Sequence, residues 1–274
     1  MHTTRSDGRL SVEEAAYHYR SAGFDAVAVT DHWRYFEGGS YEGLTLISGC
    51  EYNLGRHDTI SGVMHILGLG MKKDPNLSRE GADAPTVLEG IRAAGGLAVL
   101  AHPAWSLNTP EEVCALEGID LVEIYNTVSG VGQSSRPYSG YFADLLANRG
   151  VFYPLIATDD AHFYRGEDEC KSFVSVKAEN ASAEALLAGI RRGDFFASQG
   201  PELFVWREGN EIAVRCSECC SIDFLSNTSY AKDKMLRGEN LREGRYTVKE
   251  WEKWVRVEVC DKMGRYAWSS AIVL

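Results

Sequence analysis

The sequence predicts an α/β domain followed by a small all-β domain. Up to about residue 199, short apolar runs typical of strands alternate with amphipathic runs typical of helices, which indicates a parallel sheet or barrel. After Gln199-Gly200-Pro201 the helical period disappears, and short β-like runs separated by turn signals continue to the end. We therefore expect a larger domain at 1–199 and a β-sandwich domain at 200–274.

Each element of the first domain has a local signal. Ser11-Val12-Glu13-Glu14 has the S-x-x-E pattern of a capping box, and it begins a helix that Gly23 ends. Pro110 stands in the first turn of another expected helix. The expected strands are 25–30, 44–48, 64–69, 97–101, 120–125, 153–157, 173–176 and 195–196, and the other helices are 85–94, one from 109, 138–148 and 182–192. In the second domain the β-like runs are 203–206, 211–215, 222–225, 245–248, 254–259 and 267–273.

Composition excludes several classes of protein. The chain has 274 residues, 45% of them hydrophobic, and a net charge of -11, which argues against a nucleic-acid binder with a basic face. No run approaches the roughly 20 apolar residues of a membrane span, and no secretory leader is visible. Seven cysteines without secretory context predict reduced thiols and a cytoplasmic location. A single C-x-x-C pair, Cys216 and Cys219, beside Cys220 and with Cys260 far behind, is a weak zinc signal, and ordinary buried thiols are favoured.

The candidate site is centred on residues 156–162. An apolar run ends there at Asp159-Asp160, and His162 follows. At the end of a strand, the spacing of Asp160 and His162 would place both side chains on one face. Other expected strands also end at or beside acidic or imidazole side chains, and in a barrel these ends meet.

Imidazoles and carboxylates together suit zinc, manganese or iron. Five of the seven histidines lie at or beside expected strand ends or in the initial polar segment, whereas His18 is expected on a helix surface and His57 in a polar loop. Eight ligands exceed one ion, and Glu51 is the best residue to bridge two. The expected ligands are His2, Asp7, His32, Glu51, His65, His102, Asp160 and His162.

Adjacent divalent cations lower the pKa of a bridging water and stabilise charge on a phosphoryl or acyl centre. The chain has no G-x-S-x-G serine, P-loop or dinucleotide fingerprint, which disfavours covalent serine catalysis and nucleotide-driven motors. We expect a hydrolase with two or three zinc, manganese or iron ions and a metal-bound hydroxide. The residues expected in catalysis are Glu51, Asp160 and His162.

From His2 to about Phe196 the chain resembles the PHP (polymerase and histidinol phosphatase) family. The resemblance rests on the H-x-H, D-H, bridging glutamate, A-H-P and D-A-H motifs. It implies a distorted seven-stranded β/α barrel, with one ion held by His2, Glu51 and Asp160, a second by Glu51, His65 and His102, and a third by Asp7, His32 and His162. The matching positions are His2 with Asp7, Asp31-His32, Glu51, His65, Ala101-His102-Pro103 and Asp160-Ala161-His162.

One departure affects the first ion. The first histidine of H-x-H would precede Met1, together with most of the family's first strand, so the resemblance implies a late or truncated start. The ion near His2 would then lack one ligand and bind weakly. The tail, with Gly193-Asp194-Phe195-Phe196 and later Val255–Val259, resembles the branch of the family that carries a C-terminal β-sandwich.

Three functions stay open at this point. A phosphomonoesterase acting on a small phosphate ester leads, because the branch includes proteins labelled metal-dependent phosphoesterases. A carboxyl-ester or carbamate hydrolase with the same metal centre is the second, and a catalytically impaired metal-binding protein is the third. Arg5 and Arg165 are expected to supply counter-charge to phosphate, and Asn126 a hydrogen bond. No nucleic-acid or membrane partner is expected, and the oligomeric state is left open.

Overall fold

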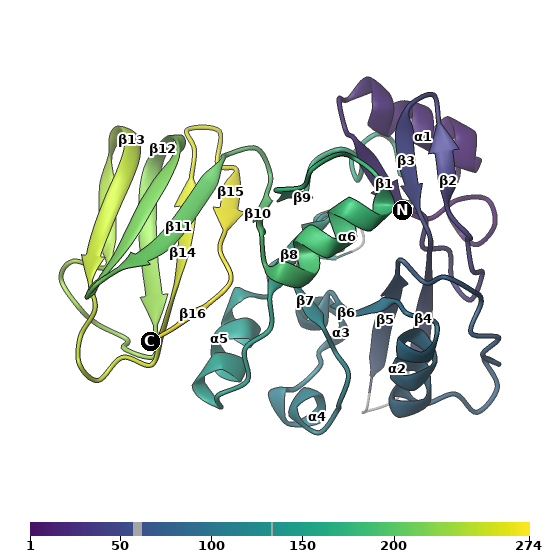
Figure 1. Ribbon diagram of the computed structural model, residues 1–274, viewed down its shortest axis with the longest axis horizontal. Coiled ribbons are helices and arrows are strands. Elements are labelled where there is room, and N and C mark those ends of the chain that lie inside the picture. Colours follow the sequence, from purple (N-terminus) through teal and green to yellow (C-terminus); the bar gives the residue numbers. More distant parts are fainter. Residues whose placement is uncertain (57–61, 133) are drawn as a thin grey trace.

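The described residues of the chain form a mixed α/β structure with three sheets. The computed structural model describes residues 1–56, 62–132 and 134–274. In Figure 1 the C-terminal strands lie at one end of the molecule, and the N-terminal and middle segments lie at the other. None of the helices in these described segments is long and apolar enough to cross a membrane.

The first sheet is small and N-terminal. Its strand order is β1-β3-β2, with β1 parallel to β3. Ser11 caps the preceding helix with the expected capping box, because its hydroxyl accepts from Glu14 and the Glu14 carboxylate accepts from Ser11. The elements are α1 Val12–Ser21, β1 Ala26–Ala28, β2 Gly39–Tyr41 and β3 Leu44–Ile47. The short strand β2 had no clear sequence signal.

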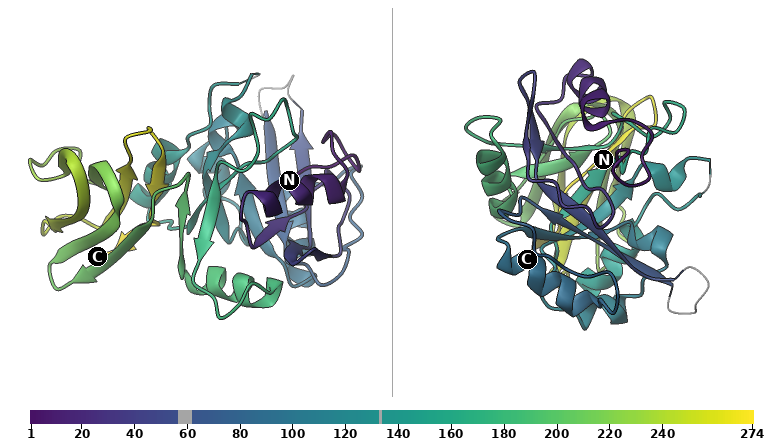
Figure 2. Two further views of the ribbon diagram at one scale, coloured as in Figure 1. Left: turned by 90° about the horizontal axis from the view of Figure 1, so that it is seen from above. Right: turned by 90° about the vertical axis from the view of Figure 1, so that its right-hand side faces the viewer.

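The second sheet positions the candidate site and is curled (Figure 2). Its order is β4-β5-β6-β7-β8, and apolar side chains pack on both faces, against α2 and α5 on one and against Leu187 of α6 on the other. The strands are β4 Gly49–Gly55, β5 Val63–Leu69, β6 Leu97–Ala101, β7 Leu121–Asn126 and β8 Leu155–Thr158. The helices are α2 Ala84–Ala93, α3 Pro103–Ser106, α4 Pro110–Cys114, η1 Val128–Gly130, α5 Gly140–Asn148 and α6 Ala183–Arg192.

The expectation of parallel pairing throughout is wrong for part of this sheet. Strand β5 is antiparallel to both β4 and β6, whereas β6, β7 and β8 are parallel. Only residues 56–62 separate β4 from β5, too few for the crossover that parallel neighbours require. A seven-stranded barrel therefore remains a prediction.

The third sheet contains most of the C-terminal residues. Its main order is β11-β12-β14-β15-β10-β9. Outside this order, β13 pairs with β12 and β16 pairs with β14. The long strand β12 has an irregular register between Arg215 and Ser221, and one apolar cluster joins Ile212 and Val214 before this point to Phe224 after it. The strands are β9 Phe173–Val176, β10 Phe195–Ser198, β11 Leu203–Glu208, β12 Glu211–Ser226, β13 Met235–Thr247, β14 Trp254–Cys260, β15 Tyr266–Trp268 and β16 Ile272–Val273. Because β9 and β10 share this sheet, the division at residue 199 stays a prediction.

Candidate metal centre

The initial segment is fixed between two parts of the fold that are distant in sequence. The His2 N–H donates to the Ala161 carbonyl at 2.8 Å, and the Thr3 N–H donates to Asp31 Oδ1 at 2.7 Å. Gly8 packs against the His2 backbone so closely that a Cβ there would lie 2.3 Å from the His2 carbonyl oxygen. The segment thus returns over His2 and carries Asp7 to the same side.

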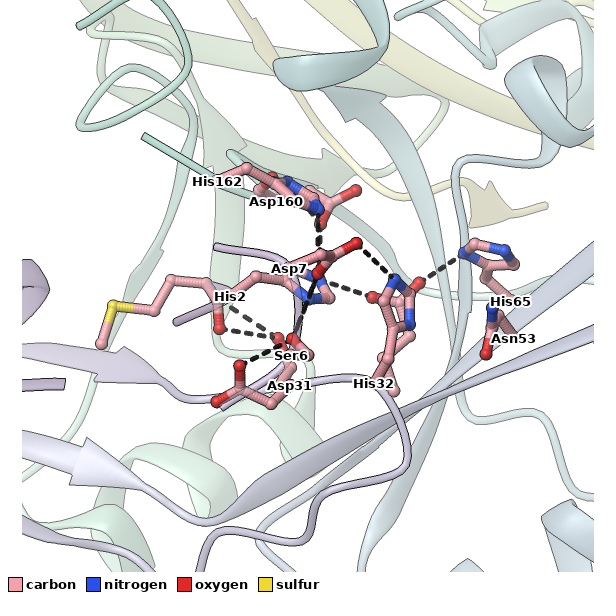
Figure 3. A network of polar contacts seen from close by, with 12 residues as sticks. His2, Ser6, Asp7, Asp31, His32, Asn53, His65, Asp160 and His162 are labelled. Atoms are coloured by element: carbon pink, nitrogen blue, oxygen red, sulfur yellow. Dashed lines mark hydrogen bonds and ion pairs between the residues drawn. The ribbon is translucent and has the colours of Figure 1, made fainter. Parts of the chain in front are cut away.

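Asp31 fixes the initial segment through hydrogen bonds to Thr3 and Ser6, a supporting role that the sequence did not indicate. Its buried carboxylate accepts from Thr3 Oγ1 at 2.8 Å and from Ser6 Oγ at 2.7 Å (Figure 3). His32 follows directly and presents its imidazole toward Asp7, with Nε2 and Oδ2 3.6 Å apart. The D-H pair therefore combines a positioning carboxylate with a candidate ligand.

Glu51 and His65 lie within strands, not at strand ends. The register pairs Glu51 with Leu67 and Asn53 with His65, so antiparallel pairing places Glu51 and His65 on one face of the sheet. His65 Nδ1 is 2.6 Å from Glu51 Oε1. The other oxygen of the same carboxylate is 2.8 Å from His2 Nε2, so Glu51 faces two groups at once.

His102 directly follows β6 and has a left-handed backbone conformation, with φ 30°. Its N–H donates to Glu123 Oε2 at 2.7 Å, and its Nδ1 is 3.0 Å from Ser106 Oγ. Glu123 is buried in β7 and also accepts from Thr158 and Asn126. We missed Glu123 because it lies inside an expected strand, although a charged residue within Leu121-Val122-Glu123-Ile124 was a usable signal.

Asp160 and His162 reach the site, but not by strand alternation as expected. Strand β8 ends at Thr158, and Asp160 has φ 52°, so the backbone turns before His162. Asp160 Oδ1 lies 2.9 Å from His2 Nε2, and His162 Nε2 lies 3.6 Å from Asp7 Oδ1. Both His102 and Asp160 thus adopt a backbone conformation that is uncommon outside glycine and is found often at functional sites.

Three overlapping groups could each hold a metal ion, and within each group the possible ligand atoms all lie within 4.8 Å of one another. His2 belongs to two groups and Glu51 to two, so the groups form one continuous cluster. The groups are His2, Asp7, His32 and His162; Glu51, His65 and His102; and His2, Glu51 and Asp160. The structure therefore brings together all eight residues that the sequence singled out.

The donor set fits divalent transition ions. Ligand atoms about 2.1 Å from a tetrahedral zinc lie about 3.4 Å from one another. His102 Nε2 is 3.6 Å from Glu51 Oε1, close to that spacing. In addition, His32 Nδ1 and His65 Nε2 are buried and have no hydrogen-bond partner within the described structure. Buried polar atoms normally have a partner, so these nitrogens are suited to binding an ion.

Protons and metal ions would compete for this cluster. Burial disfavours the charged form of His2, but the carboxylates of Asp160, Asp7 and Glu51 outweigh burial and raise its pKa well above the ordinary value. The same opposition raises the pKa of His102 to about 8. At His65 burial prevails over the Glu51 charge and lowers the pKa.

The carboxylates respond in the opposite direction. Burial raises the pKa of Glu51, but the charge of His65 and the contacts with His102 and His2 lower it well below its usual range. Burial also raises the pKa of Asp160, and the nearby Glu51 adds to this effect, but contacts with His2 and His162 give a net decrease. These carboxylates therefore stay ionised at neutral pH and can hold positive charge.

The expected substrate-binding residues lie differently from one another. Arg5 is exposed, donates to the Tyr35 carbonyl at 2.8 Å and lies over Phe36. Asn126 is buried, and its amide nitrogen donates to Glu123 at 3.0 Å and to Asp160 at 3.3 Å. Arg165 is exposed, with φ 59°. The roles of these three residues in binding stay predictions.

Arg9 was not singled out from the sequence, yet it lies beside the cluster. Its N–H donates to the His162 carbonyl, and its guanidinium lies over the Tyr164 ring at 4.9 Å. The Tyr164 ring in turn stacks on the His162 imidazole, with centroids 5.2 Å apart. Arg9 has no ion-pair partner among the described residues, so it presents a positive charge near the cluster.

The remaining histidines and cysteines lie elsewhere. His18 is exposed on α1, 3.7 Å from Glu169, and His57 lies outside the described residues. Cys216 and Cys219 are buried thiols with their sulfurs 3.5 Å apart, and burial raises their pKa values. Within the described segments, the groups suited to a metal contain no cysteine.

Comparison with known proteins gives little further information. No protein-family model matches the chain, and no curated protein matches it. The chain is similar to a crystal structure from Bifidobacterium adolescentis described as a "putative metal-dependent phosphoesterase", with 15% sequence identity and a TM-score of 0.40. The alignment covers 61% of this chain and 87% of that one. A likeness of this size does not establish a shared family.

Proposed function

We propose that the protein is a metal-dependent hydrolase, most specifically a phosphomonoesterase that acts on a small molecule, built on a distorted seven-stranded barrel of the PHP kind. The observation that carries this proposal is the continuous cluster in which His2 and Glu51 are each shared by two groups of possible ligands. Shared ligands place ions next to each other, and adjacent ions are the arrangement used for in-line displacement at phosphorus.

The residues of the cluster would bind the ions, and neighbouring residues position the side chains of the cluster. Zinc, manganese or iron would lie in the three groups, where bound cations lower the pKa of water and offset the charge that develops on a phosphoryl group. Glu51 directs one oxygen at His2 and the other at His65, and so joins two groups. Glu123 and Asn126 fix the backbone of His102 and the carboxylate of Asp160.

Direct roles in hydrolysis are assigned to Glu51, Asp160 and His162. The two carboxylates keep their negative charge at neutral pH because imidazoles surround them, and they orient the water that attacks. His162 lies at the side of the cluster that faces Tyr164 and Arg9. Contacts with Asp7 and Asp160 raise the pKa of the metal-free His162 imidazole against the effect of burial, and His162 would give up that proton on taking its place among the ligands at the reacting centre.

Arg9 supports a phosphate ester over a neutral carboxyl ester or carbamate. A guanidinium matches the planar pair of oxygens on phosphate, and Arg9 has no carboxylate partner in the described chain to neutralise it. We therefore expect inorganic phosphate to inhibit the enzyme. Changing Arg9 to Gln should weaken that inhibition about tenfold or more. Changing Arg20 of α1, which pairs with Glu42, to Gln should not.

The deciding experiment combines metal analysis with a hydrolysis screen. Purified protein loaded with zinc, manganese or iron should contain at least two ions per chain and should hydrolyse phosphomonoesters faster than phosphodiesters or carboxyl esters. His102→Ala should lose metal and activity together, while His18→Ala, which changes an exposed imidazole outside the cluster, should keep both. A metal-loaded protein that hydrolyses none of these esters, or a His102→Ala variant that keeps both properties, would exclude the proposal.

A further inference from the structure

Tyr164 lies between the candidate metal centre and an exposed arginine. Its ring is stacked with the His162 imidazole, with centroids 5.2 Å apart and an angle of 17° between the planes. His162 is stacked in turn with His2, at 4.3 Å and 12°. The guanidinium of Arg9 lies over the Tyr164 ring, 4.9 Å from its centroid. Contacts between side chains thus lead from a buried histidine, shared by two groups of possible ligands, to a positive charge at the surface.

The loop after β8 fixes Tyr164 at this place. Phe163 and Arg165, on either side of it, both have left-handed backbone conformations, with φ 64° and 59°. The fully buried carboxylate of Asp168 accepts from the N–H of Tyr164 at 2.6 Å and from that of His162 at 2.7 Å. Unfavourable backbone conformations of this kind persist where surrounding contacts impose them, and they are found often at functional sites.

The backbone of Arg9 is fixed to the same loop. Its N–H donates to the His162 carbonyl at 3.1 Å, and the carbonyl of the next residue, Leu10, accepts from the Thr4 N–H at 2.8 Å. Among the described residues, the guanidinium of Arg9 has no carboxylate partner and contacts the face of Tyr164 instead. An exposed arginine samples many rotamers, and an aromatic ring beneath its guanidinium restricts them.

Arg5 shows how this contact differs from an ordinary hydrogen bond. It is exposed on the same initial segment, but its guanidinium donates to the Tyr35 carbonyl at 2.8 Å as well as lying over the Phe36 ring at 5.5 Å. A carbonyl occupies N–H donors that a phosphate would need. A ring face occupies none, because the N–H groups of a guanidinium lie along its edge. Arg9 is therefore held in place and still able to donate.

We propose that Tyr164 is a positioning residue: its ring holds the Arg9 guanidinium ready to donate to a phosphate oxygen, and so increases the affinity of the site for phosphate. This inference rests on the proposed function, in which Arg9 supplies counter-charge to the ester. Tyr164 acts through Arg9 and needs no contact with the substrate. Burial and the charge of Asp7 raise the pKa of its phenol, so the ring stays neutral at neutral pH and attracts the cation through its quadrupole.

A double-mutant cycle tests this role with the wild type, Arg9→Gln, Tyr164→Leu and the variant that carries both changes. Calorimetric titration of each metal-loaded protein with inorganic phosphate gives a Kd and needs no hydrolytic activity. Tyr164→Leu should raise the Kd roughly threefold to fivefold, and Arg9→Gln about tenfold or more. The double variant should match Arg9→Gln within about twofold, because the ring has no effect once the guanidinium is gone. Effects that multiply in the double variant, or an unchanged Kd for Tyr164→Leu, would overturn the proposal.

Two changes that keep the ring separate positioning from packing, and they decide the question if Tyr164→Leu loses metal or stability. Tyr164→Phe should keep the Kd within about twofold of the wild-type value. Trifluorophenylalanine at this position has a similar size but less negative charge on its ring face, so it should raise the Kd roughly threefold. A wild-type Kd for the fluorinated protein would mean that the ring only fills space. Phe204→Leu, which removes the ring beneath Arg215 in the C-terminal sheet, is the matched control and should leave the Kd unchanged.

The hydrolysis screen separates this inference from the proposed function. If the Kd values follow the expected pattern but no phosphomonoester is hydrolysed, the positioning role stands and the proposed hydrolase activity fails. If phosphomonoesters are hydrolysed but Tyr164→Leu leaves both the Kd for phosphate and the KM for the ester unchanged, the positioning role fails and the hydrolase proposal stands.

Discussion

In the metal-free protein, raising the pH from 6.5 to 9 should destabilise the fold, and His102 should cause a large part of this loss. His102 is buried, with Nε2 3.6 Å from Glu51 and 3.8 Å from Asp160. Burial disfavours its charged form, but the close contact with Glu51 and the charges of Asp160 and Glu123 outweigh burial and raise its pKa to about 8.

The sign follows from the order of the two pKa values. The folded value, about 8, exceeds the unfolded value of about 6.5, so protonated His102 stabilises the fold fully below pH 6.5. This stability is lost as the pH rises through 8. The difference between the two values corresponds to about 2 kcal/mol of the free energy of unfolding.

Urea unfolding in the presence of a chelator, at pH 6, 7, 8 and 9, measures this effect. The free energy of unfolding of the wild type should fall across the series, and His102→Gln should remove about 2 kcal/mol of that fall. His18→Gln, which changes an exposed histidine, should leave the profile unaltered. A wild type that is equally stable at pH 6 and pH 9, or a His102→Gln protein with the wild-type profile, would refute the reasoning.

Three further predictions concern the cluster and its support. Glu51→Gln removes a charge shared by two groups, so metal analysis should find at least one ion fewer per chain and activity should fall at least about 100-fold. Gly8→Ala places a Cβ 2.3 Å from the His2 carbonyl oxygen, so metal titration should show at least about tenfold weaker binding, whereas Ala at the open position Gly209 should not affect it. Arg256→Met leaves the carboxylates of Asp144 on α5 and Glu258 on β14 without their buried partner. Urea unfolding should therefore show that the free energy of unfolding falls by about 3 kcal/mol, with unchanged metal content.

Much of the fold could be predicted from local signals. The Ser11 capping box, the strand Leu97–Ala101 and the helix that ends before Gly193 occur where the sequence placed them. What the sequence could not supply was the direction of pairing. The alternation of strands and helices favours parallel neighbours, but the 56–62 connection makes β5 antiparallel to β4, and tertiary packing decides how β5 then meets β6.

The possible metal ligands could be predicted from the chemistry of their side chains. The residues that position these ligands could not. His65 and His102 could be singled out because imidazoles beside apolar runs are uncommon. Asp31 and Glu123 act through backbone N–H groups, and a sequence does not show which amide a carboxylate will meet. The turn at Asp160 was missed for a related reason, because nothing in Asp159-Asp160-Ala161-His162 announces a positive φ.

These supporting carboxylates follow one pattern around the cluster. Each accepts a hydrogen bond from a backbone N–H in a segment that carries or adjoins a candidate ligand, and none is paired with a Lys or Arg side chain among the described residues. The pairs are Asp31 with Thr3, Glu123 with His102 and Asp168 with His162. Acids buried this way add negative charge to a region that already contains Glu51, Asp160 and Asp7.

That accumulation of charge explains the competition between protons and metal ions. Without metal, imidazolium groups supply the compensating positive charge, which is why the pKa values of His2, His102 and His162 are raised. A divalent ion replaces these protons and provides more charge at shorter range. Metal affinity should therefore increase with pH up to about pH 8, and calorimetry in buffers of different ionisation enthalpy should detect proton release on binding. If binding released no protons at pH 7, neutral imidazoles would have to coexist with these buried carboxylates, and the electrostatic account of the cluster would be wrong.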